Sequence, residues 1–329
     1  MQNHGLPKDC GSAMTWQNKG QIFDCSEHKI AGEPILFAQS PQAVVLADRV
    51  RVFFCTRVRD SDTTWISRPA FVDFSFDLLN IVEPPQLVEI APSELGSFDE
   101  HGIFPFHPHI SDGKFLAFST GWSRRKSVDV ETSIGALEST DEGLSFHRLG
   151  TGPVFTATLH EPFLVCDPWV VREGAKWTMW YLFGTEWDDS VQNEDPQRIY
   201  KIGKATSGDG LEWKSSNGKA VVPSQLGQHE AQALPSVRNV SGHYEMVFCY
   251  RPHRGFREPG NLSYQLGFAT SEDGETWDRD DLCVDFPKQE FDSQMRCYPS
   301  WLNLGKASFL LYNGNEFGKF GFGLAQWTG

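Results

Sequence analysis

The sequence lacks the features that identify several large classes of protein. Its N-terminal residues contain no basic segment followed by an apolar core, and no uninterrupted apolar run approaches the roughly 18 residues of a membrane-spanning helix. Basic residues are also scarce, because 29 Lys and Arg stand against 43 Asp and Glu and give a formal charge of -14. Binding to a phosphate backbone requires clustered cations, so we expect no nucleic-acid partner. The missing apolar run likewise leads us to expect no transmembrane segment.

Cysteine is infrequent and shows no ligand-like or disulfide-like spacing. The 7 cysteines are scattered and form no CxxC pair, and Cys55, Cys249 and Cys297 lie in apolar, strand-like runs. Cysteine in such runs is usually a small buried hydrophobe, so we expect reduced thiols and a cytoplasmic location. Apolar residues, by contrast, make up 40% of the chain, including 11 Trp and 25 Phe, which is enough for a packed globular core.

The chain contains an internal repeat. A proline, an apolar strand, a short polar turn and a second, aromatic-rich strand recur five times, with the prolines at 41, 108, 168, 235 and 299 and a period of 60 to 67 residues. Three copies continue into a third strand that ends in an acidic-Gly turn and an aromatic residue, as in KIGKATSGDGLEW and QLGFATSEDGETW. Asp and Gly favour such tight turns, and the aromatic residue fills the space between neighbouring sheets.

A fourth strand closes each repeat, so the pattern predicts an all-β, five-bladed β-propeller with four-stranded antiparallel blades. A β-sandwich would also show alternating strands and turns, but it would not show a fivefold phase. The fifth repeat ends after its third strand, and the N-terminal segment MTWQNKGQIF matches the pattern of the missing fourth strand. We therefore predict one domain, residues 1–329, whose blades are 35–92, 100–157, 161–224, 229–288 and 292–329 plus 14–23.

Polar residues concentrate in two classes of loop that share one face of a propeller. These are the segments that lead into the first strand of each blade, here called lead-in segments, and the hairpins between the second and third strands. Carboxylates, imidazoles, guanidiniums and aromatic rings together suit a polyhydroxylated ligand. Among the lead-in carboxylates, the candidate catalytic residues are Glu161, Asp167, Glu230 and Asp292. The candidate substrate-binding residues are His101, His107, Trp122, Trp187, Arg251, His253, Arg296, Asn313 and Asn315.

The motifs DPW, KIGKATSGDGLEW, QLGFATSEDGETW and YNGNEFGKFGFGLA together resemble those of the five-bladed propeller superfamily of glycoside hydrolases. That superfamily includes arabinanases and β-xylosidases, invertases and levansucrases, and mannoside phosphorylases. The likeness covers nearly the whole chain and is greatest to uncharacterised members from bacterial surface-polysaccharide gene clusters. It implies a carbohydrate-active enzyme, hydrolytic or glycosyl-transferring, that acts on a bacterial surface glycan or its sugar precursor.

In the hydrolases of this superfamily, three inner-strand carboxylates act as base, acid and sugar-orienting group. This sequence departs from that pattern, because Ser40 and His107 precede the first two prolines and only Asp167 supplies an acid before its proline. If the protein is a glycosidase, we expect Glu230 to be the proton donor, with a raised pKa, and Asp167 to stay ionised as base or orienting group. Arg251 and Arg296 would then bind an anionic part of the substrate.

The loss of the first-blade acid keeps a second function open, namely a non-catalytic propeller that binds a glycan or a sugar nucleotide in polysaccharide biosynthesis. The partner in either case is a carbohydrate or a sugar-containing small molecule. No cofactor is firmly implied, although the resemblance places a divalent cation, calcium, in the channel. The residues identify no metal ligands, no particular sugar or linkage, and no oligomeric state.

Overall fold

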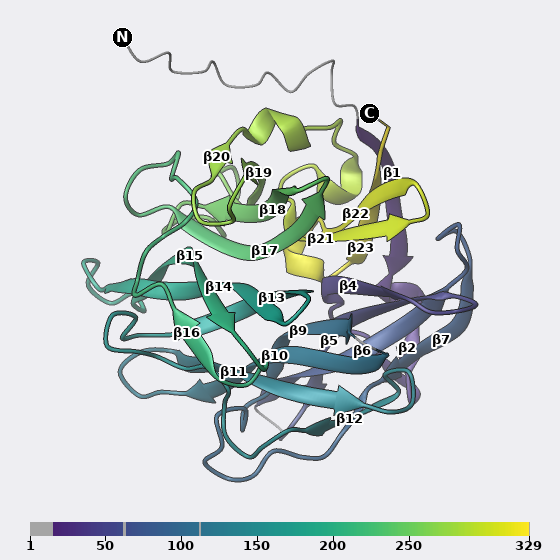
Figure 1. Ribbon diagram of the computed structural model, residues 1–329, viewed down its shortest axis with the longest axis horizontal. Helices are drawn as coiled ribbons and strands as arrows, with labels where there is room; N and C mark the ends of the chain where they lie inside the picture. The colour runs from purple at the N-terminus through teal and green to yellow at the C-terminus, as the bar shows by residue number, and fades with distance from the viewer. Residues whose placement is uncertain (1–15, 62–63, 112, 329) are drawn as a thin grey trace.

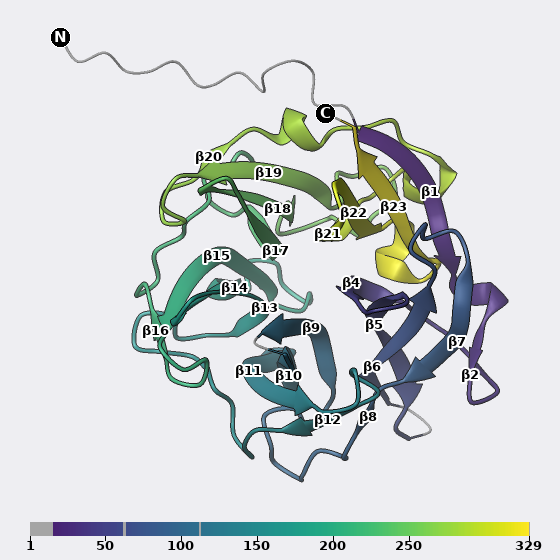
Figure 2. The ribbon, with the colours of Figure 1, turned by 45° about the vertical axis from the view of Figure 1, so that its right-hand side comes forward.

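The computed structural model describes residues 16–61, 64–111 and 113–328, and within these ranges the chain contains no α-helix. Five antiparallel blades of four strands each are arranged in a ring around a central channel, as predicted (Figures 1 and 2). In the second blade, the two-residue strand β8 (Glu89–Ile90) is added at the outer edge, parallel to the fourth strand. The first strand of each blade lies nearest the channel. The first two blades are β4 (Gln39–Val45), β5 (Val50–Arg59), β6 (Trp65–Phe74), β7 (Ile81–Leu87), and β9 (Ile103–Ser111), β10 (Lys114–Arg124), β11 (Val130–Ser139), β12 (Ser145–Arg148).

The remaining blades repeat this order. The third contains β13 (Val165–Glu173), β14 (Lys176–Asp188), β15 (Gln197–Ser207) and β16 (Trp213–Ser215), and the fourth contains β17 (Ala231–Val240), β18 (His243–Arg251), β19 (Gln265–Ser271) and β20 (Asp278–Arg279). The fifth contains β21 (Cys297–Leu304), β22 (Ala307–Asn313), β23 (Gly321–Trp327) and β1 (Trp16–Asp24). Short pieces complete the chain: β2 (Lys29–Ile30), β3 (Glu33–Pro34), β8 (Glu89–Ile90), and the 3₁₀ turns η1 (Cys25–Glu27), η2 (Asp281–Val284), η3 (Glu290–Asp292) and η4 (Asn315–Gly318).

The ring closes in the fifth blade, where strands from opposite ends of the sequence pair. β1 lies antiparallel to β23, with Trp16 opposite Trp327 and Asp24 opposite Gly321. Trp16 is buried, stacks on Trp301 at 5.5 Å between ring centroids, and donates its indole N–H to the carbonyl of Cys283. The predicted closing strand is therefore confirmed from residue 16 onward, whereas positions 14 and 15 of that prediction lie outside the described residues.

The acidic-Gly turns take the predicted form. In the third blade, Asp209 Oδ1 accepts hydrogen bonds from the backbone N–H groups of Leu211 and Glu212 at 2.8 and 2.9 Å. Gly210 follows with a φ of 81°, a conformation that side-chain-bearing residues rarely adopt. Asp273 makes the equivalent turn in the fourth blade. In the second blade the turn has one more residue before its glycine, and Asp141 Oδ1 accepts from the backbone N–H of Ser145.

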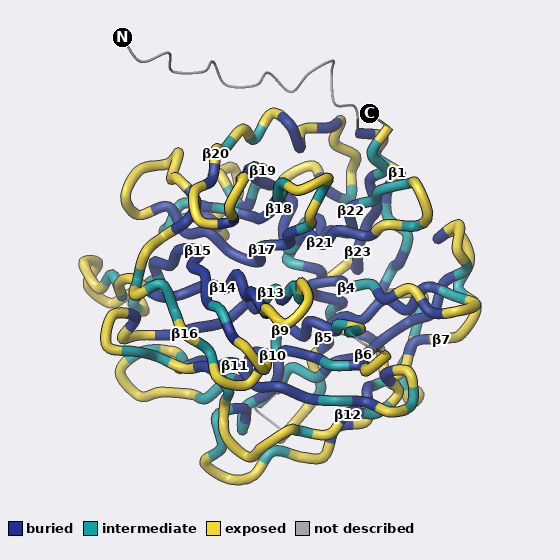
Figure 3. The backbone as a smooth tube through the Cα atoms, viewed as in Figure 1, coloured by how far each residue is buried: buried dark blue, intermediate teal, exposed yellow. Residues whose placement is uncertain are grey.

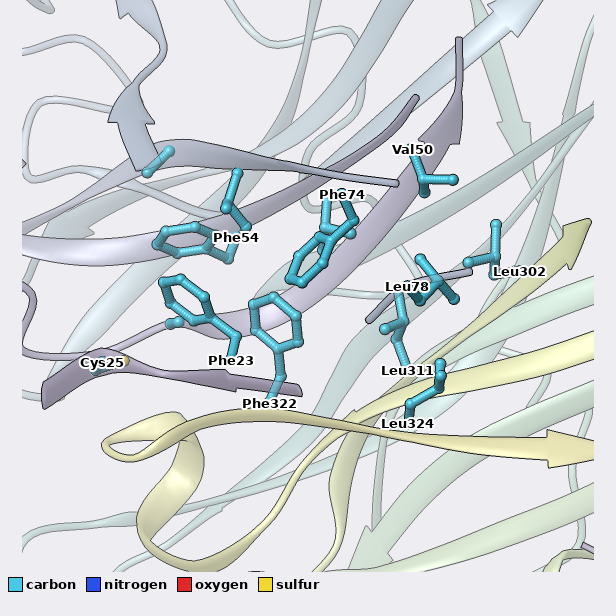
Figure 4. Close-up of a cluster of buried hydrophobic side chains, with 14 of the residues drawn as sticks. Phe23, Cys25, Val50, Phe54, Phe74, Leu78, Leu302, Leu311, Phe322 and Leu324 are labelled. Carbon is cyan, nitrogen blue, oxygen red and sulfur yellow. The ribbon is translucent and has the colours of Figure 1, made fainter. Parts of the chain in front are cut away.

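The hydrophobic core is divided among the spaces between neighbouring blades, and most exposed residues lie in loops and in outer strands such as β7 (Figure 3). Figure 4 shows one such cluster, in which Phe23 and Phe322 of the fifth blade pack against Phe54 and Phe74 of the first. Phe23 stacks on Phe322 at 5.0 Å between ring centroids. This packing joins the closing strands to the next blade as well as to each other.

Four of the five inner strands carry the same irregularity close to the channel. Ser40, Asp167, Leu234 and Tyr298 each precede a proline and have positive φ angles of 48–57°, and the strand register shifts at each of these sites. Non-glycine residues in this conformation are strained by about 1–3 kcal/mol and are common at functional sites. The bulge interrupts the alternation of side chains along the strand. In three of these four blades the bulged residue, Asp167, Leu234 or Tyr298, lines the cavity described below.

Five of the described cysteines, Cys25, Cys55, Cys166, Cys249 and Cys297, are free and buried. Burial raises the pKa of the Cys249 thiol above its usual range, as expected for a small hydrophobe inside a sheet. Cys283 differs, because it is disulfide-bonded, so the prediction of reduced thiols is wrong at this position. Among the described residues, no helix has the length and apolar character required to cross a membrane.

Candidate functional site

A cavity of about 360 Å³ lies at one end of the channel and is lined by residues from all five blades. The wall is built from bulged inner-strand residues such as Asp167, Leu234 and Tyr298, from the ends of second strands, and from the loops that follow them. This volume lies at the lower end of the range for small-molecule sites, which is roughly 300–1,000 Å³. The cavity therefore suits a small ligand.

The cavity wall is strongly basic although the protein as a whole is acidic. Five arginines line it, and none of them forms an ion pair with a carboxylate of the described chain: Arg57, Arg124, Arg198, Arg251 and Arg257. Asp167 is the single carboxylate among the described lining residues. Uncompensated guanidinium groups in a concave site attract anions and bind carboxylate or phosphate oxygens in a forked geometry.

Aromatic rings separate and orient these charges. Arg251 is 3% exposed and donates through Nε and Nη2 to the hydroxyl of Tyr200 at 3.1 and 2.7 Å. Its guanidinium carbon lies 3.7 Å from the centroid of the Phe256 ring. Arg198 lies 5.6 Å from the ring centroid of Trp122 and 6.0 Å from that of Trp187. Stacking of this kind holds a guanidinium in place while leaving its charge uncompensated.

Asp167 occupies the bulge at the start of β13, with a φ of 55°. Its backbone N–H donates to Thr120 Oγ1, and its Oδ2 accepts a hydrogen bond from the backbone N–H of Leu234 at 3.1 Å. Burial raises the pKa of Asp167 to about 6, although the Leu234 hydrogen bond and the charge of Arg198 oppose part of this effect. The carboxyl group is thus mostly ionised at neutral pH and is a stronger base than an ordinary aspartate.

Glu230 does not line the cavity. Its Oε2 accepts hydrogen bonds from the backbone N–H groups of Gln225 and Leu226, and its Oε1 accepts from Gln232 and from Arg279 at 2.7 Å. Burial alone would raise the pKa of Glu230, but these hydrogen bonds and the charge of Arg279 together lower it. The sequence-based expectation of a raised pKa is therefore wrong, because an ionised Glu230 anchors the loop that leads into β17.

The other two predicted catalytic carboxylates also lie away from the cavity wall. Asp292 is fully buried and accepts hydrogen bonds from Arg296 Nε at 2.7 Å and from Tyr312 OH at 3.0 Å. Glu161 is fully buried and accepts hydrogen bonds from Tyr181 OH and from the backbone N–H of Gly218, both at 2.8 Å. Each carboxylate ties its lead-in segment to a neighbouring strand or loop.

Of the nine predicted substrate-binding residues, His101, Trp122 and Arg251 line the cavity. Arg296 is paired with Asp292, and His253 Nε2 lies 3.1 Å from Asp188 Oδ2. The remaining four do not line the cavity either: His107, Trp187, Asn313 and Asn315. Asn313 instead accepts from the backbone N–H of Ser40 and donates to the carbonyls of Ala38 and Gly321, so it joins the fifth blade to the first.

The channel below the cavity does not match a calcium site. Burial and the neighbouring His109 lower the pKa of His107 to about 3, so its imidazole is neutral, and its Nδ1 lies 3.3 Å from Gln42 Oε1. Calcium prefers six to eight oxygen ligands with several carboxylates. In residues 16–61, 64–111 and 113–328, no three His, Cys, Asp or Glu side chains are grouped so as to hold a metal ion.

Several cavity residues were missed by the sequence-based choice. Arg57 lies near the end of β5 in the first blade, and Arg257 lies in the loop after β18 in the fourth. Both positions belong to the hairpins expected to be functional, but the sequence offered no reason to prefer these two arginines over the others. Arg198 lies at the start of β15, a third strand, and Tyr298 occupies the bulge before Pro299. The position of Tyr298 immediately before a repeated proline was the feature of the sequence that could have identified it as a cavity residue.

Comparison with known proteins gives relatives of the whole chain and of its fold. No family model matches the sequence. An uncharacterized protein of Mycobacterium tuberculosis (strain CDC 1551 / Oshkosh) is 28% identical over 316 residues, which cover 95% of this chain and 99% of the relative.

Several solved structures with the same architecture are described as glycoside hydrolases. One belongs to the GH130 family of mannoside phosphorylases, which contains glycoside hydrolases that target β-1,2-mannosidic linkages. It aligns with a TM-score of 0.68 at 11% identity, and the alignment covers 98% of this chain and 95% of that chain. An α-L-arabinofuranosidase from Lactobacillus brevis aligns with a TM-score of 0.60 at 12% identity, covering 93% and 94%. A thermostable family-43 glycoside hydrolase gives 0.59 at 14% identity, covering 88% of each chain. The predicted likeness to glycoside hydrolase propellers is confirmed at the level of the fold.

Proposed function

We propose that this chain, which has the five-bladed fold of glycoside hydrolase structures, is a carbohydrate-active enzyme that transfers a glycosyl group, with Asp167 as its general base. The observation that carries the proposal is that one carboxylate, with a pKa of about 6, lines a basic and aromatic cavity. Trp65, Trp122 and Tyr298 supply flat apolar faces of the kind that pack against sugar rings.

The number of carboxylates in the cavity favours transfer over hydrolysis of an ordinary glycoside. Hydrolysis needs one carboxylic acid to protonate the leaving oxygen and one carboxylate to activate water or attack carbon. Glu161, Glu230 and Asp292 are fully buried elsewhere, so the described cavity wall supplies one such group. One base suffices when the leaving group departs as a stable anion, because such a group needs no proton. The acceptor hydroxyl then loses its proton to Asp167 as it attacks the sugar carbon.

An activated sugar precursor is therefore the donor in this proposal, and a bacterial surface glycan or its intermediate is the acceptor. The cytoplasmic location expected from the sequence belongs to the same proposal, since sugar precursors are made there. The second candidate is a non-catalytic propeller that binds a sugar precursor. Ser40 and His107 favour it, because they stand where the family resemblance would place carboxylates.

The replacement Asp167→Asn tests the enzymatic proposal. Wild-type protein is incubated with glycosyl phosphates or nucleotide sugars and with saccharide acceptors, and products are followed by mass spectrometry. We expect transfer by the wild type and a loss of about 100-fold or more in the variant, which is the usual contribution of a general base. Equal turnover by both proteins would remove Asp167 from the mechanism. Binding without turnover by the wild type would favour the non-catalytic candidate.

A further inference from the structure

Arg251 lines the cavity, but most of its N–H groups are used within the protein. Its Nε and Nη2 both donate to the hydroxyl oxygen of Tyr200, at 3.1 and 2.7 Å. Its Nη1 donates to the backbone carbonyls of Pro252 and His253, at 2.9 and 3.2 Å. Because a guanidinium has five N–H donors, these contacts leave Arg251 little capacity to hydrogen-bond a ligand directly. Its effect on the cavity is therefore transmitted through Tyr200.

The hydroxyl groups of Tyr200 and Tyr264 lie 2.7 Å apart, so one of them donates a hydrogen bond to the other. The Tyr200 oxygen already accepts two hydrogen bonds from Arg251, which occupy its lone pairs. Tyr200 is therefore the donor of the pair, and its proton points to the oxygen of Tyr264. The Tyr264 proton then points elsewhere, and no side chain or backbone group in the described ranges accepts it.

Tyr264 thus presents a hydrogen-bond donor of fixed direction. It immediately precedes β19, lines the cavity and is 5% exposed. Its oxygen is already occupied by the proton of Tyr200, so toward a ligand the hydroxyl acts as a donor. Burial raises the pKa of Tyr264 well above its usual range, and the charge of Arg251 opposes only part of this effect. The donor proton is therefore present at neutral pH.

Aromatic rings surround this donor. The ring centroid of Tyr264 lies 6.0 Å from that of Phe256, 6.1 Å from that of Phe317 and 5.9 Å from that of Tyr298, and all four rings line the cavity. The motif YNGNEFG, which the proposed chemistry does not use, supplies Phe317. Gln39 Nε2 holds that residue in place by donating to its backbone carbonyl at 2.8 Å. Phe256 and Phe317 carry no polar side-chain atom, so the wall beside the donor is apolar.

A ligand group that fits this place combines an acceptor oxygen with an apolar surface. A sugar hydroxyl that accepts from Tyr264 keeps a proton of its own, and the rings of Phe256 and Phe317 offer no acceptor for it. The carbonyl oxygen of an N-acetyl group has no proton and accepts strongly. The methyl group next to that carbonyl packs favourably on aromatic rings.

We propose that Tyr264 is a specificity-determining residue that selects an N-acetylated amino sugar, and that Tyr200 and Arg251 are its positioning residues. The Tyr264 hydroxyl donates to the acetyl carbonyl, and the acetyl methyl packs against Phe256 and Phe317. This inference rests on the proposed function, because it takes the cavity as a sugar site and the acetamido sugar as the glycosyl unit. A cavity of about 360 Å³ suits one such sugar.

Calorimetry with three matched pairs of sugars tests the selectivity: N-acetylglucosamine with glucose, N-acetylgalactosamine with galactose, and N-acetylmannosamine with mannose. We expect the wild type to bind at least one acetylated sugar about 10-fold or more tighter than its parent hexose. Tyr264→Phe should reduce that ratio of affinities about 5-fold or more, because the buried carbonyl loses its donor.

Tyr244→Phe is the matched control. Its hydroxyl likewise donates within the protein, to Glu173 Oε2 at 2.7 Å, but Tyr244 does not line the cavity. This variant should keep the wild-type ratio, and melting curves should show that both variants are folded.

Tyr200→Phe tests the positioning role. Without the Tyr200 proton, the Tyr264 hydroxyl is free to turn toward other partners, so the ratio should fall. In the Tyr264→Phe background, the same change should have no further effect on the ratio. A role of Tyr200 in stability alone would not produce this dependence on Tyr264, and equal ratios in Tyr200→Phe and the wild type would overturn the positioning role.

The outcomes separate this inference from the proposed function. A wild type that binds the parent hexoses as tightly as the acetylated sugars, or binds neither, would overturn the selectivity. An unchanged ratio in Tyr264→Phe would overturn the assignment to Tyr264. If the ratio depends on Tyr264 but the wild type transfers no sugar, the selectivity stands and the enzymatic proposal fails. If the wild type transfers sugars without preference for an acetyl group, the enzymatic proposal stands and the selectivity fails.

Discussion

Replacing Glu230 with glutamine should destabilise the protein and leave the chemistry of the cavity intact. The carboxylate accepts four hydrogen bonds, two on each oxygen, from Gln225, Leu226, Gln232 and Arg279. A glutamine amide has nearly the same shape, but in either orientation its NH₂ group faces two donors. The change therefore removes a charge and also sets donor against donor in a site that is fully buried.

The size of the effect follows from the burial of the ion pair. The side chains of Arg279 and Glu230 are 2% and 0% exposed, and breaking a buried ion pair costs about 3–5 kcal/mol. Because Arg279 keeps a second partner, Asp281 at 2.8 Å, we expect the lower end of that range, about 3 kcal/mol. Unfolding entropy of about 2.1 cal/mol/K per residue gives about 0.7 kcal/mol per degree for a chain of this length. The melting temperature should therefore fall by about 4 °C.

Calorimetric or circular-dichroism melting curves at pH 7 measure this difference, and Glu212→Gln serves as the control. Glu212 is exposed and its side chain makes no ion pair in the described chain, so its replacement should shift the melting temperature by about 1 °C or less. Because the pKa of Glu230 is lowered by folding, its contribution is present above its ordinary pKa and is lost as the pH falls through the lowered one. The difference between wild type and variant should shrink in acid. A variant that melts like the wild type but has lost turnover would refute this structural role.

Three further outcomes are expected. Trp16→Ala should lower the free energy of unfolding in urea by about 3–5 kcal/mol, because a buried ring that contacts Trp301 and Trp327 is lost. Trp65→Ala should lower it far less, because Trp65 is 42% exposed. Because folding raises the pKa of Asp167, the wild type should lose stability as the pH rises from about 4 to about 6. The melting temperature of Asp167→Asn should therefore increase relative to that of the wild type over this rise in pH, by the equivalent of at most about 3 kcal/mol. Transfer activity should rise with pH to a plateau above about pH 6, and a flat pH–rate profile would contradict the assignment of Asp167 as base.

The fold was predictable because its signals are local and occur several times. Each acidic-Gly turn depends on residues a few positions apart. The five copies of the proline-led pair of strands predict five sheets that follow one another along the chain. Ring closure was also readable, because MTWQNKGQIF could be compared with the fourth strands of other repeats. The disulfide of Cys283 was not, since an odd set of scattered cysteines contains no information on pairing.

The cavity was less predictable, because a lead-in acid can either face the ligand or fasten its own loop. Asp167 stands immediately before its proline, at the bulge that turns its side chain to the cavity, whereas Glu230 comes five residues before Pro235. Leu234 and Tyr298 occupy the bulge in the next two blades and also line the cavity. Ser40 and His107 also precede repeated prolines but do not line the cavity, so position relative to the proline narrows the choice of cavity residues without deciding it.

The pairing of β1 with β23 has a consequence for the order of folding. Four blades are each made from one continuous stretch of chain, whereas the fifth needs Trp16 and Trp327 to meet. Bringing such distant residues together costs loop-closure entropy that local hairpins avoid. During synthesis, the early strand must wait while every other blade is made, exposing an edge to which chaperones or other chains can bind. A circular permutant that links β23 to β1 and opens the chain between β16 and β17 would give every blade a continuous sequence and should fold faster.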